Sequence, residues 1–362
     1  MEIDQYIAKM KNIQNTLLAY IEGEDVSGSN YANFNKLLDD LNIRRKKHEL
    51  KSLLHLISVI SNHHHRFPSF FPKIFQILRD LRNEMQIFFS NLTIFNIFRK
   101  NKRILLFLFD ERILIVNETI VSIIKTNKYS KLNYPEYFLT EIRPFVNDDY
   151  VDSLMYKMPE EYEKYRRIGE GFYTIVDLII EDKIDEFVSY VNERNLSFNY
   201  IPEISIVETN PLLITNQSSL IEYAFFYGSK KIINCLIEKG VELTSSLWLY
   251  AIHSNNLDII KILGDHEVNL PKKSFKGVLW ESIKCHHVEL TNYIIQKYYK
   301  ELNRKSYLFQ SLKYYNFNFI DEKLINDSLF FNLCKYDYFD LVDKFLNENK
   351  NIDVNQTKVL LI

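Results

Sequence analysis

Apolar residues recur at helical spacing through most of the chain. In the first 22 residues one stripe contains Ile3, Ile7, Met10, Ile13, Leu17 and Ile21, which predicts an amphipathic helix. The same pattern predicts a second helix over about 31–61, helical structure over 74–98, and one or two helices over 103–124. Residues 24–30, EDVSGSN, have the composition of a loop, and Pro68 and Pro72 bracket a break.

The most regular pattern lies between Ser219 and Leu243, SLIEYAFFYGSKKIINCLIEKGVEL. Two apolar stripes at helical spacing are separated by Gly228 and followed by Gly240. Glycine costs least where a left-handed residue closes the last turn of a helix. The stretch therefore predicts two short antiparallel helices. Such a pair is too small to bury its own apolar faces, so we expect further pairs to stack against it.

Four more copies of the pattern are found when the chain is aligned on the residue that closes the first helix. The closing positions are Asp182, Gly228, Asn255, His286 and Asp337. Gly, Asn, Asp and His are the residue types that most readily take a positive φ. Seven residues before each closing position the alignment predicts a core column of Ile175, Ile221, Trp248, Leu279 and Phe330. The wide gap between the last two copies is predicted to hold an added helix within 306–327.

These patterns divide the chain into three predicted regions and an all-α fold. Residues 1–130 form a helical N-terminal region, 131–170 a partly helical connector, and 171–362 an irregular, ankyrin-like α-solenoid. The charge differs between the parts: residues 1–130 carry 19 Lys/Arg and 13 Asp/Glu, whereas the remainder carries 26 and 34. The chain ends in NIDVNQTKVLLI, which resembles the end of one repeat and the start of another.

Composition narrows the class of protein. With 46% hydrophobic residues, only eight Gly and eight Pro, and a net charge of −2, the 362-residue chain has enough apolar side chains for real cores and favours helix. The three cysteines are odd in number and widely spaced, which is typical of a reducing compartment. The sequence starts without a signal-peptide core, and its strongest apolar run, 104–109, is far shorter than the ~20 residues of a membrane helix. We expect a soluble, intracellular, cytoplasmic protein without membrane insertion.

Several short motifs invite a chemical interpretation, and each has a simpler structural one. The segment 168–172, IGEGF, resembles a kinase glycine loop but lacks its third Gly and the other kinase motifs. The run His63–His65 has no nearby Cys or spaced His, so a surface turn is the better interpretation. In Cys285-His286-His287, His286 occupies a helix-closing position, so we interpret the group as structural. We therefore predict no catalytic residue, metal site or cofactor.

Two basic runs and two tryptophans are candidates for binding, and each also has a structural interpretation. The runs 44–47 and 99–103 could contact phosphate, but the overall acidity favours solvated helix faces and no nucleic acid. Trp248 falls in a core column, whereas Trp280 lies one position off that column and is the better candidate for an exposed contact.

The repeat segments also carry a resemblance to a family. SLIEYAFFYGSKKIINCLIEKGVELTSSLWLYAIHSNNLDIIKIL, followed by ESIKCHHVELTNYII, resembles the divergent ankyrin-like domain that is expanded in trichomonad parasites. The helical N-terminal region, ETNPLL at 208–213 and SIKCHH at 282–287 are similar to that family too. Phe225 stands where ordinary ankyrins have a small residue, and their Thr-Pro-Leu-His opening is absent. The resemblance implies an uncharacterised ankyrin-repeat protein that binds another protein.

The functional hypothesis is a non-catalytic protein–protein interaction module whose partner the sequence does not name. Ankyrin repeats usually bind through their finger tips and the face of the first helix. On this chain that suggests residues one to three before the closing position, Tyr227, His253, Ser254 and Lys284, together with Trp280, as partner-binding residues. Two alternatives stay open. One is an enzyme with its chemistry in the N-terminal helical region, and the other is a cytoskeletal or membrane-skeleton adaptor.

Overall fold

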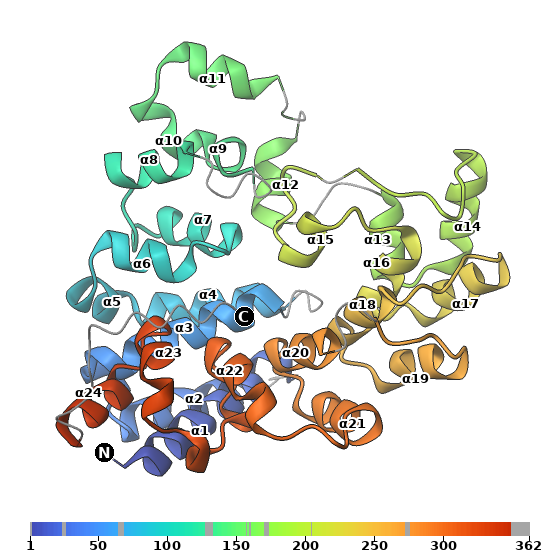
Figure 1. Cartoon of the computed structure of the whole chain (residues 1–362). Helices are drawn as coiled ribbons and strands as arrows, with labels where there is room; N and C mark the ends of the chain where they lie inside the picture. The colour runs from blue at the N-terminus through green and yellow to red at the C-terminus, as the bar shows by residue number, and fades with distance from the viewer. Residues whose placement is uncertain are drawn as a thin grey trace. The chain divides into compact units, whose positions relative to one another are not determined.

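The structure is a computed structural model that describes residues 2–23, 27–63, 69–126, 133–156, 158, 161–169, 174–203, 205–271 and 276–348, except the side chain of Asp327. Within these ranges the regular elements are helices and none is a strand (Figure 1). The predicted all-α class is therefore confirmed. The C-terminal NIDVNQTKVLLI segment lies outside the described residues.

The chain divides into two compact units, residues 1–60 with 282–362 (unit 1) and residues 61–281 (unit 2). The predicted limits at residues 130 and 170 both fall inside unit 2. Helices α3 and α20 each run from one unit into the other. The α-helices that lie wholly or mainly in unit 1 are α1 (Ile3–Glu22), α2 (Ser29–Asp40), α3 (Lys47–His63), α21 (Val288–Tyr298), α22 (Lys305–Lys313), α23 (Phe330–Lys335) and α24 (Phe339–Glu348). Its short 3-10 helices are η1 (Ile43–Arg45), η5 (Phe317–Phe319), η6 (Glu322–Leu324) and η7 (Asp327–Leu329).

Unit 2 contains two series of helices. The first consists of α4 (Phe70–Asp80), α5 (Arg82–Phe88), α6 (Asn91–Phe98), α7 (Lys102–Asp110), α8 (Glu118–Lys125), α9 (Tyr134–Tyr137), α10 (Leu139–Ile142), η3 (Arg143–Phe145), α11 (Asp148–Met155) and α12 (Tyr162–Ile168). The second consists of α13 (Thr174–Ile180), α14 (Ile184–Glu193), α15 (Pro211–Thr215), α16 (Leu220–Tyr227), α17 (Lys230–Glu238), α18 (Leu247–His253), α19 (Leu257–Asp265) and α20 (Gly277–Lys284). Residues 133–169 are thus partly helical, as predicted.

The prediction of one helix over 31–61 is wrong. The chain breaks between α2 and α3, where Asn42 takes a left-handed conformation with φ 55°. Arg44 turns back onto α2 and donates hydrogen bonds to Asp39 Oδ1 (3.2 Å) and Asn35 Oδ1 (2.8 Å). Asparagine tolerates positive φ better than most residues, so a single local residue ends the helix despite the continuous apolar stripe. The segment 74–98 is likewise divided among α4, α5 and α6.

The predicted left-handed closing positions are confirmed in all five copies. Their φ angles are 50° at Asp182, 74° at Gly228, 48° at Asn255, 59° at His286 and 57° at Asp337. In three of the five copies, the amide that follows the closing residue donates to the carbonyl five residues earlier, which is the bond of a Schellman motif. The alignment therefore identified a backbone property from residue type alone.

The predicted core column is buried as well. Seven residues before each closing position, all five side chains are buried, with Trp248 only 1% exposed. Eight residues after it, four of five are buried and Tyr190 of the first copy is half-buried. The first copy is also exposed at Glu186, four residues after its closing position, where the other copies have the buried residues Ile232, Ile259, Leu290 and Leu341. Each helix pair thus buries its apolar side chains.

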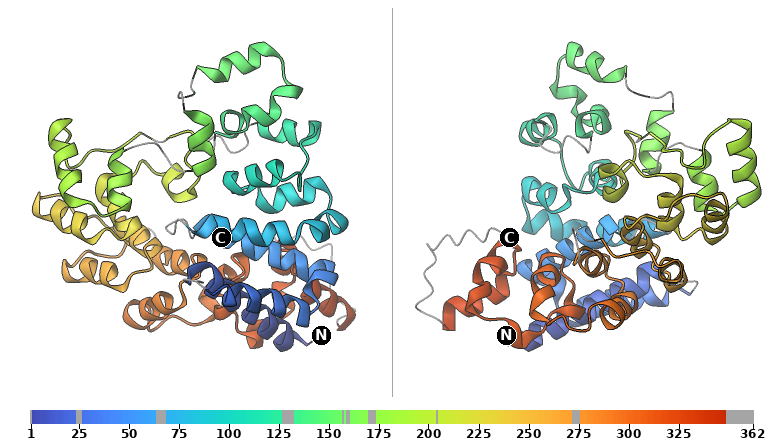
Figure 2. Two further views of the ribbon diagram at one scale, coloured as in Figure 1. Left: turned by 180° about the vertical axis from the view of Figure 1, so that it is seen from behind. Right: turned by 45° about the vertical axis from the view of Figure 1, so that its right-hand side comes forward.

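The pairs of unit 2 stack through their first helices. Helix α16 packs between α13 and α18, and α14 packs against α17. Figure 1 labels these helices, and Figure 2 shows the same yellow-green to gold segment from two further directions. Asp182 joins consecutive pairs, because its carboxylate accepts the Lys231 and Ile232 amides at 3.1 and 3.0 Å. A carboxylate at a helix N-terminus satisfies free amides and complements the helix dipole. The closing residue of one pair therefore caps the second helix of the next.

In unit 1 helices from the N-terminal part of the chain pack against described segments from its C-terminal part. Gln14 of α1 is fully buried; it donates to Asn316 Oδ1 (3.1 Å) and accepts the Phe317 amide (2.7 Å). Figure 1 shows the N-terminal helices in blue beside the C-terminal helices in red. Tyr315 is a further left-handed residue, with φ 52°, at the end of the predicted added helix. Its ring stacks on Tyr338 (5.0 Å), a contact that favours a conformation rarely taken by bulky residues.

Replacing Gly228 by alanine is expected to lower the free energy of unfolding by about 2 kcal/mol, because an L-residue loses about 1–2 kcal/mol in the left-handed region. The added Cβ would also meet Ser254 Cβ at 3.3 Å. Gly240→Ala is the matched control, since Gly240 has φ +79° but open space around it. Urea denaturation of both variants separates the two effects: equal losses would mean that crowding at Ser254 contributes nothing.

Candidate functional site

The predicted partner-binding residues differ in how accessible they are. Tyr227 at the end of α16, and Trp280 and Lys284 on α20, are half-buried. His253 and Ser254 are 2% and 0% exposed. Ser254 Oγ donates to the Ala251 carbonyl (2.7 Å) and accepts the Asn256 amide (3.2 Å), so it stabilises the turn after α18. That any of the five contacts a partner stays a prediction.

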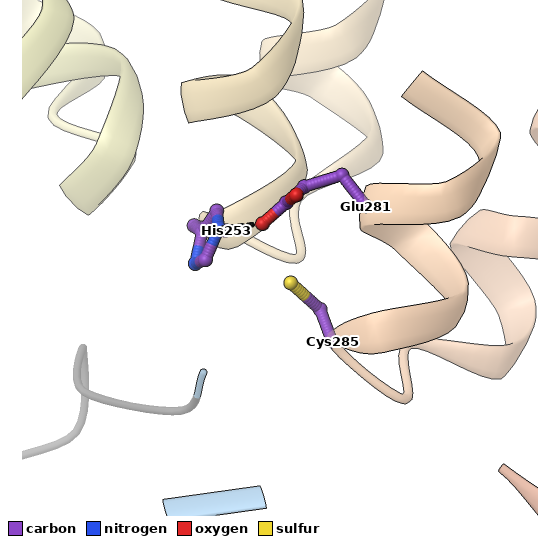
Figure 3. A group of neighbouring side chains, drawn as sticks. All are labelled: His253, Glu281 and Cys285. Atoms are coloured by element: carbon purple, nitrogen blue, oxygen red, sulfur yellow. Dashed lines mark hydrogen bonds and ion pairs between the residues drawn. The ribbon is translucent and has the colours of Figure 1, made fainter. Parts of the chain in front are cut away.

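His253 is instead paired with an acidic residue inside unit 2. Figure 3 shows His253, the last residue of α18, facing Glu281 of α20. Nε2 of His253 lies 2.8 Å from Oε1 of Glu281, within hydrogen-bond distance. With the carboxylate ionised, Nε2 is the donor. The imidazole also stacks on Phe226 (5.0 Å between centroids) and lies edge-on to His63 at 6.2 Å. Contacts on several sides therefore hold the imidazole in one orientation.

A thiol follows this pair along the chain. Cys285 comes four residues after Glu281, one turn further on and directly after α20, and it is fully buried (Figure 3). Residues at i and i+4 of a helix lie on the same face. His253, Glu281 and Cys285 each offer one ligand atom of a type that transition metals accept. The Glu-x-x-x-Cys spacing was visible in the sequence, but the imidazole comes from a helix 28 residues earlier.

The described residues of the histidine and glycine motifs lie at the ends of helices. His63 ends α3 and is 8% exposed, so its assignment to a surface turn is wrong; His64 and His65 lie outside the described residues. His286 is buried and left-handed, which confirms its structural interpretation. In the segment 168–172, Gly169 closes α12 with φ 76°, and its carbonyl accepts Thr209 Oγ1 at 2.7 Å. Residues 170–172 of that motif lie outside the described part.

Two residues of the run 99–103, Asn101 and Lys102, are buried, against the prediction of a solvated face. Lys102 is 1% exposed; it donates to the Ile206 carbonyl (3.3 Å), and its ammonium lies 4.6 Å from the centre of the Tyr137 ring. Burial lowers the pKa of Lys102 to about 7, against the opposing effect of Glu208 and Glu136. The composition of the run does not indicate this burial, because it depends on Tyr137 and Ile206, which are distant in the chain.

A second buried cation lies nearby in unit 2. Arg166 of α12 is fully buried and donates to Glu141 Oε2 (2.6 Å), Glu163 Oε2 (2.7 Å) and the Tyr137 carbonyl (3.0 Å). Tyr137 in turn donates its hydroxyl to the Arg166 carbonyl (2.8 Å). These bonds join α9, α10 and α12 and give the connector region a polar core.

Comparison of the chain with known protein families, curated proteins and solved structures found no match. No family model matches the chain, and neither a curated protein nor a solved structure matches it. Among the helices of the described ranges, none has the length and apolar character needed to cross a membrane.

Proposed function

We propose that this protein is a non-catalytic module that binds another protein through the ends of its stacked helix pairs. The observation that carries the proposal is the recurrence of a helix pair with a left-handed closing residue. Three such pairs stack one after another in unit 2. Stacked repeats repeat their loops and helix ends along one direction, which creates an extended surface for a protein ligand. The resemblance of residues 219–295 to a divergent ankyrin-like family supports the same function.

The proposed contact residues are the accessible members of the predicted set, Tyr227, Trp280 and Lys284. Each is half-buried, so part of its surface is open to a partner while the rest is held by neighbours. Tyrosine and tryptophan are enriched in interface hot spots because they bury a large area with little loss of side-chain freedom. In this proposal His253 and Ser254 support the helix ends from inside.

Proximity labelling with the full-length chain in the source cell identifies the partner, and titration of that purified partner then tests the proposal. Tyr227→Ala and Trp280→Ala are each expected to weaken binding at least tenfold, the size of an ordinary hot-spot effect. Lys261→Ala is the matched control, because Lys261 is exposed on the second helix of its pair. Unchanged affinity in a Tyr227→Ala/Trp280→Ala/Lys284→Ala variant would contradict the assignment of this surface.

A further inference from the structure

We propose that the His253–Glu281 pair is the core of a structural site for a divalent transition-metal ion of the Zn²⁺ class, completed by the Cys285 thiolate one turn after Glu281. This inference is independent of the proposed binding function. Imidazole, carboxylate and thiolate are the three side-chain ligand types of zinc sites. The combination with a thiolate favours Zn²⁺ over the hard cations Mg²⁺ and Ca²⁺, which prefer oxygen ligands alone.

The geometry of the pair suits direct ligation. His253 Nε2 and Glu281 Oε1 are 2.8 Å apart, close to the ~3.3 Å that separates two ligand atoms each ~2.0 Å from a tetrahedral ion. When the ion takes the place of the shared proton, that proton moves from Nε2 to Nδ1 of the imidazole. The Cys285 thiol gives its proton to solvent, so one proton is released for each ion bound.

Burial indicates a structural rather than a catalytic ion. The side chains of His253 and Glu281 are 1% and 14% exposed, and Cys285 is fully buried. Catalytic zinc keeps an open position for water, whereas structural zinc is enclosed by four protein ligands. An ion here would link the end of α18 to α20 and so stabilise the packing of these two helices.

The candidate for the fourth ligand is His63, which lies outside the group of three whose ligand atoms fall within 4.8 Å of one another. Its ring centroid lies 6.2 Å from that of His253, and two imidazoles on one tetrahedral ion have centroids about 5 Å apart for Zn–N distances of ~2.0 Å. A shift of about 1 Å at the end of α3 would bring the two rings onto one ion. This also gives a role to the start of the His63–His65 run.

The test uses the full-length protein and two metal probes. After dialysis against chelator and then one equivalent of Zn²⁺, elemental analysis is expected to find about one zinc ion per chain. Co²⁺ substitution is expected to give the intense d–d bands of a tetrahedral site together with a thiolate-to-cobalt charge-transfer band. Zn²⁺ is also expected to raise the Tm, because a ligand that binds only the folded state stabilises it.

Three variants and two controls assign the ligands. His253→Ala is expected to abolish stoichiometric binding, and Cys285→Ser to remove the charge-transfer band. Glu281→Gln keeps a hydrogen-bond acceptor for His253, so it is expected to fold as the wild type does while binding zinc at least tenfold more weakly. The controls, His266→Ala and Cys334→Ser, remove an exposed imidazole and an exposed thiol outside the site and are expected to bind as the wild type does.

Two results would overturn the proposal. One is a wild-type chain that takes up no zinc at micromolar free Zn²⁺ and shows no Zn²⁺-dependent change in Tm. The other is zinc uptake that Glu281→Gln and Cys285→Ser leave unchanged, or that His266→Ala removes as completely as His253→Ala. In either case His253 and Glu281 form an ordinary buried hydrogen bond.

Discussion

Replacing Arg166 by methionine is expected to lower the free energy of unfolding by about 3–5 kcal/mol, the usual cost of removing one partner of a buried ion pair. Methionine fills a similar volume but cannot pair with Glu141, whose side chain is 11% exposed. The carboxylate would be left buried without its cation. The Tyr137 carbonyl, which accepts from Arg166 at 3.0 Å, would lose a donor at the same time.

Urea denaturation followed by far-ultraviolet circular dichroism measures the loss. Lys164→Met is the matched control, since Lys164 lies on the same helix in an exposed pair with Glu161 (3.0 Å), and surface pairs contribute at most about 1 kcal/mol. The double variant Arg166→Met/Glu141→Gln is expected to recover part of the loss, because it removes the unpaired charge. A single variant as stable as Lys164→Met would show that these bonds do not support the connector.

Replacing Lys102 by methionine is expected to have the opposite effect, raising the free energy of unfolding at pH 7 by about 2 kcal/mol. Burial lowers the pKa of Lys102 to about 7, so holding its ammonium in the folded chain costs free energy that a thioether does not. The gain is reduced by losing the hydrogen bond to the Ile206 carbonyl and the contact with the Tyr137 ring.

The pH dependence identifies the cause. Between pH 7 and the ordinary lysine pKa of 10.5, the unfolded chain binds a proton at Lys102 that the folded chain does not. Stability therefore rises with pH in this window, by up to about 1.4 kcal/mol per pH unit. In Lys102→Met this slope is lost, so its advantage over the wild type is expected to shrink between pH 7 and pH 9.

Unfolding curves at pH 7, 8 and 9 check the prediction. Lys125→Met is the control, because Lys125 also lies over a tyrosine ring, that of Tyr150 at 4.9 Å, but is exposed. It is expected to keep the wild-type slope. A Lys102→Met variant with the same slope as the wild type would mean that Lys102 stays protonated in the folded protein over the whole range.

Local backbone features could be predicted well. Asp182, Asn255, His286 and Asp337 were recognised as left-handed because their residue types tolerate positive φ and because the apolar columns around them repeat. The left-handed Tyr315 is not predicted, because tyrosine is not among the residue types that readily take a positive φ. The break at Asn42 was missed for the opposite reason: the apolar stripe continues through it, while one residue ends the helix.

The candidate sites needed the tertiary structure. The sequence predicts His253 at a partner-binding helix end, yet its imidazole turns inward to Glu281. It places Lys102 in a solvated basic run, yet the side chain is buried against Tyr137. In both cases the sequence places the Cα on a helix correctly, whereas the direction and surroundings of a long polar side chain depend on helices distant in the chain.

The helical class, the closing residues and the apolar columns can be predicted from local sequence, because they follow from short-range sterics and from a periodicity that neighbouring residues share. Which segments form a unit depends instead on contacts between residues that are distant in the chain. Residues 1–60 join 282–362, and buried amide contacts such as Gln14–Asn316 span 302 residues. Such pairing depends on the shape and hydrogen-bonding of surfaces that come together only on folding.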